Sequence, residues 1–468
     1  MRSLLNNLRL ALVVLVLAAI GLIGGLIVQQ DRSQARMSAA GENRIALAQR
    51  YENAGNIVSA DGILLATSEE GSRRYAEDEV LQKAVMPLVG DYTHIMTNTI
   101  ETRYEDILLG SDRSLSRQLF LDVSGRGLSG DHVHLTLDAE LTRLAYTLLG
   151  ERKGAVAMIN YDTGDVIALA STPSATADEV IQFTGLPESA LFNRALQGAY
   201  TPGSTFKILT SAAWVDSNMY DPALVILDND GRSTVSPSGA RDREGSSHGP
   251  VDLNRALRIS CNVFFGEIGA RMGGDEMLRY YDQMGILAPA SLDRLDIRDT
   301  ELYTPSDDLG LVSWFSIGQP SGTNIIRMAP LELASIIGGI ANDGVRATPQ
   351  LISHFSDPLG RQYGTPERSS ERMMESASAS IIEDLMIDAV NGEGAGGVGA
   401  KVSGLTIGGK TGTPEIAGQS NHNAVFAGFV QEEDYPYAIA VIVEEAGYGA
   451  TEAAPIAHEM FRTIFERG

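Results

Sequence analysis

Residues Ser403–Thr413 read SGLTIGGKTGT, and the interpretation of this stretch decides between two kinds of fold. From Gly404 to Thr411 it fits G-x-x-x-x-G-K-[ST], the pattern of a phosphate-binding loop between a buried strand and a helix. It also contains Lys410-Thr411-Gly412, a piece of the signature of serine acyl-transferases. The two interpretations predict either a protein that uses ATP or GTP, or an enzyme that acylates itself on a serine.

The neighbouring residues argue against a phosphate-binding loop. Ala400–Gly404, at the start of the pattern, does not read as a buried parallel strand, and Gly412 and Pro414 disfavour a helix directly after it. A strand edge suits these residues better, because glycine permits an extended ligand to lie close to the backbone at Gly412 and Thr413. We therefore interpret the phosphate-loop match as accidental and expect no bound nucleotide.

The N-terminus carries a long apolar run, Leu10–Val28, with the sequence LALVVLVLAAIGLIGGLIV. As a helix it would be about 28 Å long, roughly the thickness of the hydrocarbon layer of a membrane. Arg2 and Arg9 precede it, which favours a cytoplasmic N-terminus and an extracytoplasmic body. A cleaved signal peptide is the alternative, but the run exceeds a usual signal core and no clear small-x-small cleavage site follows. The sequence predicts an uncleaved single-span anchor within residues 1–30.

The composition argues against several other classes of protein. The formal net charge of -24 over 468 residues disfavours a nucleic-acid-binding surface. Cys261 is the only cysteine, so neither an intramolecular disulfide nor a cysteine-based zinc site is expected. His132 and His134 lie on one face of an expected strand and could bind a metal, but no third ligand is near in sequence. Solvent-facing histidines are the preferred interpretation there.

The pattern of polar and apolar residues changes near residue 151. Residues 31–150 are polar and mixed, with two short strands expected around an Asp-Gly turn within Asn56–Ala66. The rest of the chain predicts strands at both of its ends and helices between them, which indicates an α+β fold with one antiparallel sheet and helices on its faces. The expected strands are Gly154–Tyr161, Asp165–Ser171, Ala424–Val430 and Tyr437–Val443, and the expected helices lie near 205–216, 252–272, 274–284, 330–342, 378–391 and Ala453–Phe465.

A candidate nucleophile lies in Tyr200–Ser211, YTPGSTFKILTS, which reads as a turn that enters a helix. Ser204 is at or near the helix start, and Lys207 lies three residues on, on the same face. A serine hydroxyl needs a base beside it, and a lysine can serve if burial or a second cation lowers its pKa from about 10.4. Lys410 is a candidate for that second cation. The alternative is a helix-capping serine and a surface lysine, but the apolar neighbours of Lys207 favour a buried one.

The tripeptide Ser260-Cys261-Asn262 interrupts an apolar helical stretch. Because one residue separates the serine from the asparagine, both cannot stay on one face of a regular helix. A short loop between two helices would let both side chains point into a cleft. A polar interruption that is satisfied by the backbone is the alternative, and from the residues alone both interpretations stay open.

Three motifs, Ser204-x-x-Lys207, Ser260-x-Asn262 and Lys410-Thr411-Gly412, follow one another in the order found in penicillin-binding proteins and serine β-lactamases. Over about 151–468 the chain resembles penicillin-binding proteins of the class B D,D-transpeptidase type. Val425 stands where that family often has tryptophan and Pro414 where alanine is usual, and both departures concern the rim of the site. The flanking segments that carry the resemblance are Thr163–Pro173, Asn193-Arg194-Ala195, Gly318-Gln319-Pro320, Met328–Ala334 and Ala341–Gly344.

The resemblance implies the order of the domains. A cytoplasmic tail and membrane helix, residues 1–30, would precede a small β-rich pedestal near the membrane, residues 31–150. A penicillin-binding transpeptidase domain, residues 151–468, would follow, with an antiparallel sheet sandwiched by helices and an all-helical part. No separate glycosyltransferase domain fits before residue 151, so a bifunctional class A enzyme is excluded on length.

The resemblance also implies roles for the first two motifs. Ser204 would attack the carbonyl between the last two D-alanines of a peptidoglycan stem peptide, and Lys207 would accept its proton. Ser260 would relay a proton to the leaving D-alanine, and Asn262 would hold the amide of the donor peptide. The amine of a neighbouring stem would then take the acyl group and form a crosslink. A β-lactam would imitate the donor and remain on the serine.

The third motif is implied to bind the end of the substrate. Lys410 would supply positive charge and help to keep the catalytic lysine neutral. The hydroxyls of Thr411 and Thr413, beside the backbone of Gly412, would hold the terminal carboxylate. The backbone N–H groups of Ser204 and Thr413 would form the oxyanion hole. This mechanism needs no metal and no other cofactor.

Two alternative functions stay open. A D,D-carboxypeptidase or β-lactamase on the same scaffold would hand the acyl group to water, although the sequence has no obvious E-x-x-L-N candidate for a lactamase base. A non-catalytic β-lactam-binding scaffold could have lost one of the motifs, and none is lost. The family also implies a partner, a multi-span membrane polymerase of the glycan, with the apolar run and the pedestal as its contact.

Overall fold

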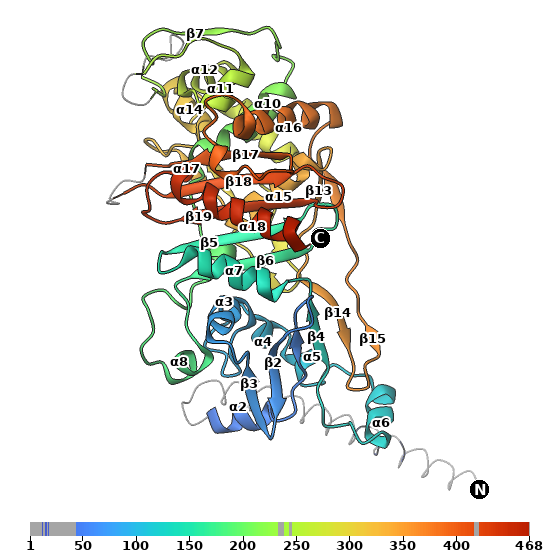
Figure 1. Ribbon diagram of the computed structural model, residues 1–468. Coiled ribbons are helices and arrows are strands. Elements are labelled where there is room, and N and C mark those ends of the chain that lie inside the picture. Colours follow the sequence, from blue (N-terminus) through green and yellow to red (C-terminus); the bar gives the residue numbers. More distant parts are fainter. Residues whose placement is uncertain are drawn as a thin grey trace, which may run out of the picture.

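The computed structural model describes residues 12, 15, 17, 44–232, 238–242, 246–415 and 421–467. Within this part of the chain, no helix is both long and apolar enough to cross a membrane. The predicted anchor Leu10–Val28 lies outside the described residues, except for Leu12, Leu15 and Leu17. The two main sheets of the described chain follow one another along the length of the molecule (Figure 1).

The larger sheet consists of five antiparallel strands, β5 (Gly154–Asn160), β6 (Val166–Thr172), β17 (Ile407–Gly412), β18 (Ala424–Val430) and β19 (Tyr437–Val443). Their order is β17-β18-β19-β5-β6, so strands from the start of this region pair with strands from its end. The predicted α+β fold with one antiparallel sheet is therefore confirmed. The stretch Ser403–Thr413, which fits two sequence patterns, contains β17, the edge strand of this sheet.

Helices cover both faces of the larger sheet (Figure 1). Along β5, Ala155 and Ala157 belong to one hydrophobic core, whereas Val156 and Met158 belong to another, because successive side chains of a strand point to opposite faces. The first core contains the helix α15, and the second contains α7 and α18. The helices around this sheet are α7 (Ala139–Leu149), α9 (Arg194–Gln197), α15 (Pro330–Ala341), α17 (Gly449–Glu452) and α18 (Ala454–Arg467). A further helix, α8 (Ala177–Gln182), lies toward the other end of the molecule in Figure 1, where Ala177 and Val180 pack in a separate cluster with Met86 and Met96.

A mainly helical part lies beyond the β17 edge of the sheet, at the top of Figure 1. Its central helix α10 is buried along its whole length, and Phe206 at its start packs edge to face against Tyr281 and Phe315. The elements of this part are η2 (Gly203–Thr205), α10 (Phe206–Val215), β7 (Ile226–Asp228), β8 (Gly249–Val251), α11 (Leu253–Ile259), α12 (Asn262–Met272), α13 (Gly274–Gln283), α14 (Leu309–Ser316), α16 (Ser376–Asn391) and η4 (Val398–Ala400).

The smaller sheet lies at the other end of the molecule and has six strands in the order β15-β14-β4-β1-β2-β3. They are β1 (Ile57–Val58), β2 (Leu64–Glu69), β3 (Ser72–Tyr75), β4 (His132–Leu135), β14 (Ile352–Ser356) and β15 (Gln362–Tyr363). Because β14 and β15 come from far beyond residue 150, this sheet joins segments from both sides of the boundary that the sequence predicts. The boundary itself stays a prediction.

Short helices surround the smaller sheet, and four pairs of short strands complete the described elements. The helices are α2 (Arg44–Arg50), α3 (Glu79–Val89), α4 (Ile100–Arg103), α5 (Glu105–Leu108) and α6 (Leu115–Val123). Three of the strand pairs are β9 (Ser291–Leu292) with β10 (Leu295–Asp296), β11 (Glu301–Tyr303) with β12 (Ile325–Arg327), and β13 (Val345–Ala347) with β16 (Ser370–Arg372); the fourth is β7 with β8.

The sequence predicts that the two histidines of β4 face solvent. In the structure both are half-buried. The Asn56 backbone N–H donates to His132 Nδ1 at 2.8 Å, and His134 Nε2 is hydrogen-bonded to Ser356 Oγ at 2.9 Å. The ring of His134 stacks on that of His354, with 4.2 Å between the ring centroids. Burial lowers the pKa of His134 to about 4, so this histidine is neutral at pH 7 and acts in packing.

Candidate active site

Ser204 lies in the short 3-10 turn η2, directly before the buried helix α10. The turn begins at Gly203, whose φ of 57° favours glycine. A Cβ on Gly203 would lie 2.8 Å from the backbone nitrogen of Pro414, so the turn and the chain after β17 approach each other closely. The expectation of a turn that enters a helix at Ser204 is therefore confirmed.

Lys207 is fully buried one turn after the serine, as the sequence predicts. Its ammonium Nζ donates to the Ser260 carbonyl oxygen at 2.7 Å, to Ser260 Oγ at 3.1 Å and to Asn262 Oδ1 at 2.6 Å. These bonds tie the first motif to the second. Within the part of the chain that the structure describes, Ser204 Oγ and Lys207 Nζ do not form a hydrogen bond.

The second motif occupies a sharp junction between α11 and α12. Ser260 ends α11 in the left-handed conformation, with φ 61° and ψ 39°, and Cys261 starts α12 by accepting the N–H of Phe264 on its sulfur. This break turns both Ser260 and Asn262 toward Lys207. Of the two interpretations that the residues left open, the structure therefore has the short loop between two helices.

Lys410 lies on β17 opposite Ala427 of β18, and its side chain is buried. The next glycine, Gly412, passes so close to the serine turn that a Cβ on it would lie 2.3 Å from the Pro202 carbonyl oxygen. The Gln319 side-chain amide donates to the Thr413 carbonyl oxygen at 3.2 Å and holds the end of this segment. The third motif is therefore placed directly beside the first, on an edge strand.

A cavity of about 640 Å³ opens where the three motifs meet. Ser204, Ser260, Asn262, Thr411 and Thr413 line it, together with Arg241, Asp242, Trp314, Gln319 and Tyr448. Lys207 and Lys410 are buried behind this lining. The cavity brings together residues from three distant parts of the chain, and Ser204 is part of its lining.

The two buried lysines have unusual acidity. Burial lowers the pKa of Lys207 to about 8. Burial and then the positive charge of Lys207 lower the pKa of Lys410 to about 7. Because the two ammonium groups disfavour each other, the pair shares its protons near neutral pH, and one of the two lysines can act as a base there.

Four side chains form a compact group next to the second motif: Asp228, Asp242, His248 and Cys261, whose donor atoms all lie within 4.8 Å of one another. His248 Nδ1 lies 2.8 Å from a carboxylate oxygen of Asp228 and 3.1 Å from one of Asp242. Carboxylate, imidazole and thiolate are ligands that Zn²⁺ accepts, so these residues could hold such an ion. Burial raises the pKa of the Cys261 thiol to about 12, and a bound cation would lower it again.

A single cysteine predicts no cysteine-based zinc site. In the structure, however, two carboxylates and a histidine lie beside Cys261. These other donors come from the end of β7 (Asp228) and from the loop between β7 and β8 (Asp242 and His248), and they cannot be associated with Cys261 by spacing. Asp242 also accepts the backbone N–H of Asn262 at 2.5 Å, so it supports the second motif directly. Sequence reasoning missed Asp242, because no local pattern marks it. A cation held here would fix the position of the Ser260–Asn262 junction.

Comparison with known proteins gives one family. The family model "Penicillin binding protein transpeptidase domain" matches residues 154–464. The peptidoglycan D,D-transpeptidase PbpA of Mycolicibacterium smegmatis is 28% identical over 98% of this chain and 99% of its own, and PbpA of Mycobacterium tuberculosis is 27% identical over 91% of each.

Solved structures agree with the sequence comparisons. The penicillin G acyl-enzyme complex of penicillin-binding protein A from M. tuberculosis superimposes with a TM-score of 0.76, at 26% identity, over 89% of this chain and 99% of that one. A D,D-transpeptidase domain from Eggerthella lenta gives a TM-score of 0.76 at 25% identity, over 88% and 98% of the two chains.

Proposed function

Since this chain belongs to the penicillin-binding protein transpeptidase family, we propose that it is a membrane-anchored peptidoglycan D,D-transpeptidase that crosslinks stem peptides through an acyl-enzyme on Ser204. The observation that carries this proposal is the convergence of Ser204, Ser260, Asn262 and Thr413 on one cavity, with Lys207 bonded behind it. The names of the relatives, which are peptidoglycan D,D-transpeptidases, support the reaction and the substrate.

In the acylation step, Ser204 Oγ attacks the carbonyl carbon between the two terminal D-alanines, and neutral Lys207 takes the hydroxyl proton. The backbone N–H groups of Ser204 and Thr413 stabilise the oxyanion. Ser260, which is hydrogen-bonded to Lys207 Nζ, passes a proton to the nitrogen of the departing D-alanine as the peptide bond breaks. In the second half, an amine of a neighbouring stem attacks the serine ester, and the proton returns to Ser204 Oγ.

The terminal carboxylate of the donor lies against β17 in this proposal. The hydroxyls of Thr411 and Thr413 donate to it, and the charge of Lys410 attracts it. A bound carboxylate favours the protonated form of Lys410, and protonated Lys410 in turn favours neutral Lys207. Substrate binding therefore selects the charge state that acylation requires.

The rate of acylation by a β-lactam should depend on pH along a bell-shaped curve with its maximum between about 7 and 8. Below this range both lysines are protonated and the base is missing. Above it the pair loses its remaining proton, so no lysine charge is left to attract the carboxylate. The second-order rate constant for acylation, measured from pH 5.5 to 10, tests this. In Lys410→Arg the falling limb should move above pH 10, because arginine stays charged. A flat profile in the unchanged protein would contradict the proposed roles.

A fluorescent penicillin should label the full chain covalently. Ser204→Ala should lose all stable labelling, because alanine lacks the hydroxyl on which the ester forms. Labelling is read on a denaturing gel and by mass spectrometry of the peptide that contains residue 204. Ser211→Ala provides a matched control, since Ser211 lies on α10, the helix that follows the Ser204 turn, and donates to the Lys207 carbonyl oxygen. Stable labelling of the Ser204→Ala variant would contradict the assignment of Ser204 as the nucleophile.

The acceptor separates transpeptidation from the alternatives on the same scaffold. With a donor peptide and an amine acceptor, a transpeptidase makes the crosslinked product, a carboxypeptidase makes only the shortened peptide, and a non-catalytic scaffold makes neither. Product analysis by mass spectrometry distinguishes these outcomes.

We further propose that Leu10–Val28 spans the cell membrane with the N-terminus in the cytoplasm. The length of the apolar run and the arginines before it support this orientation. The catalytic part would then be extracytoplasmic. A multi-span membrane polymerase that makes the glycan strand is the proposed partner, with the anchor and residues 31–150 as its contact.

A further inference from the structure

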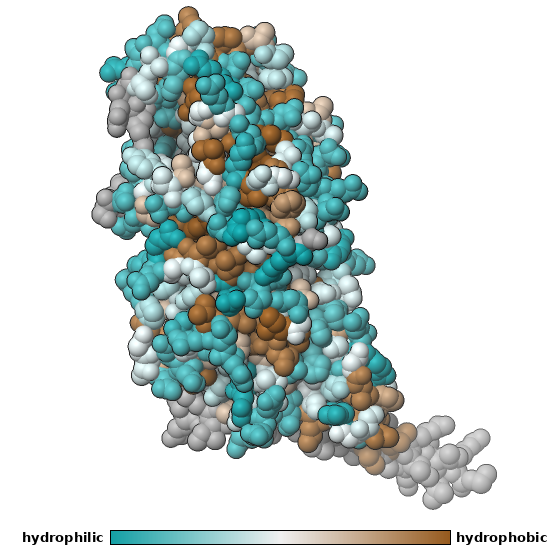
Figure 2. Space-filling model, in the orientation of Figure 1, coloured by the Kyte–Doolittle hydropathy of each residue, from teal (hydrophilic) through white to brown (hydrophobic). Residues whose placement is uncertain are grey.

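Helix α6 (Leu115–Val123) presents an apolar face to solvent. Leu115, Leu119 and Val123 are spaced four residues apart and so lie on one side of the helix, and Phe120 lies next to them. Leu115 is 77% exposed and Val123 is 89% exposed, and Leu128, shortly after the helix, is 87% exposed. Figure 2 shows apolar side chains gathered at the lower right of the molecule, where Figure 1 places α6.

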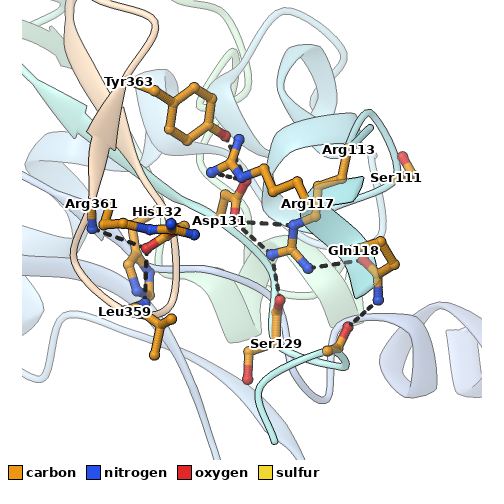
Figure 3. Close-up of polar contacts among 12 residues, drawn as sticks. Ser111, Arg113, Arg117, Gln118, Ser129, Asp131, His132, Leu359, Arg361 and Tyr363 are labelled. Atoms are coloured by element: carbon orange, nitrogen blue, oxygen red, sulfur yellow. Dashed lines mark hydrogen bonds and ion pairs between the residues drawn. The ribbon is translucent and has the colours of Figure 1, made fainter. Parts of the chain in front are cut away.

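The opposite side of α6 is fixed to the protein, so this exposure is not the result of a loose helix. Asp131, directly before β4, is fully buried and pairs with Arg113 at 2.5 Å and with Arg117 at 3.1 Å. Tyr363 of β15 donates its hydroxyl to the same carboxylate at 2.6 Å. Leu121 is buried beneath the helix. Figure 3 shows this network between α6, β4 and the β14–β15 hairpin.

The network determines which way α6 faces. A buried ion pair is costly to break, and rolling the apolar side of the helix inward would pull Arg117 away from buried Asp131. Arg113 also donates to the Ser129 carbonyl oxygen, and the Gln118 side chain donates to the Gly127 carbonyl oxygen at 3.0 Å. These contacts hold the segment before and after the helix. The apolar face is thus held outward by the fold itself.

The position of α6 relative to the predicted anchor indicates what covers this face. Only fifteen residues, 29–43, separate Val28 from the start of α2, and fully extended they reach about 50 Å. α2 is joined to the same small sheet as α6, since Arg50 pairs with Glu105 of α5 at 2.7 Å and α5 packs on β4. Figure 1 places α2 and α6 at the same end of the molecule. The proposed anchor would therefore hold α6 within reach of the membrane surface.

We propose that the apolar face of α6 lies in the boundary between headgroups and acyl chains of the membrane that holds the anchor. This inference rests on the proposed span at Leu10–Val28. An amphipathic helix with leucine and phenylalanine on one face suits that boundary. The guanidinium of Arg361 lies 4.4 Å from the Phe120 ring centroid, and exposed Arg126 follows the helix, so both can reach lipid phosphates at its margin.

The occupant of this one face is a lipid surface, which leaves the rest of residues 31–150 for the proposed polymerase, because the tether brings α6 to the lipid at no further cost in concentration. A linker of this length holds α6 at a high effective concentration at the bilayer, so a few inserted side chains are enough. The chain then has two attachments to the membrane, the span and α6. Together they set the tilt of the rigid body that carries the cavity.

The test uses the full chain in vesicles of phosphatidylcholine and phosphatidylglycerol. Val123→Cys and Val225→Cys are each labelled with the fluorophore NBD, which is selective because the native Cys261 is buried. Val225 is 53% exposed and directly precedes β7, at the opposite end of the molecule, so it is a matched control. Nitroxide lipids should quench NBD at 123 at least threefold more than at 225, and iodide in the water should quench it less.

A second variant tests the role of the apolar face directly. Adding Leu115→Ser and Leu119→Ser to labelled Val123→Cys should reduce the lipid quenching to the level at position 225, with penicillin labelling of Ser204 unchanged. Equal quenching at 123 and 225 in the unchanged helix would overturn the proposal. So would protection from iodide without lipid quenching, which would indicate a protein contact. Flotation with the vesicles and penicillin labelling report the anchor and the nucleophile separately, so their failure is distinguishable.

Discussion

Lys207→Met should slow the acylation of Ser204 by a β-lactam by about a thousandfold, within the range that a general base contributes. Methionine fills a similar volume in the buried position beside Phe265, so the packing of α10 is kept while the base is lost. The hydrogen bonds to Ser260 and Asn262 are lost with it. Stopped-flow measurement with a fluorescent penicillin gives the rate.

Two comparisons make this result specific to the base. Lys207→Arg should also be slow, because arginine keeps its proton at every accessible pH and cannot accept the one from Ser204. Thermal unfolding of both variants should stay cooperative, which shows that the loss is not a loss of fold. An acylation rate within tenfold of the unchanged protein in Lys207→Met would contradict the role of Lys207.

Arg73→Leu should lower the free energy of unfolding of the part with the smaller sheet by about 3–5 kcal/mol. Arg73 Nε lies 2.7 Å from Glu101 Oε1, and both side chains are completely buried. The same guanidinium donates to the Gly55 carbonyl oxygen at 2.7 Å. Without Arg73 the carboxylate is left buried and unpaired, and burial already raises the pKa of Glu101. Urea unfolding measures the change.

The double variant Arg73→Leu/Glu101→Leu should recover most of the lost stability, because it removes both buried charges together. The half-exposed pair of Lys83 and Glu79 is the control, and Lys83→Leu should cost less than about 1 kcal/mol. A double variant as unstable as the single one would show that the cost lies in packing or in the bond to Gly55 and not in the unpaired charge.

Sequence reasoning was most accurate where a pattern is local. The hairpin β5–β6 could be predicted because Asp162-Thr163-Gly164 separates two apolar runs, and Gly164 has the positive φ that such a turn requires. The edge position of β17 followed from Gly412 and Pro414, which disfavour a helix. The buried state of Lys207 followed from its apolar neighbours on a single helix.

Sequence reasoning failed where the contact partners are distant in the chain. β14 and β15 are short and polar, and nothing local indicates that they extend a sheet begun at residue 57. Asp242 has no pattern of its own and reaches the second motif only because the β7–β8 loop folds over Cys261. The pKa values of Lys207 and Lys410 depend on how deeply the two side chains are buried and how close together they lie, and the spacing of the motifs in the sequence does not determine either.

The smaller sheet has a mechanical consequence for the enzyme. The chain passes between the two sheets at β4 to β5, returns at β13 to β14, and leaves again at β15 to β16. A body joined by several covalent crossings and a hydrogen-bonded ladder transmits torque, whereas a single flexible linker does not. In the proposed membrane arrangement, a tilt of the smaller sheet would therefore be passed on to the serine turn and would change the height of the cavity above the membrane.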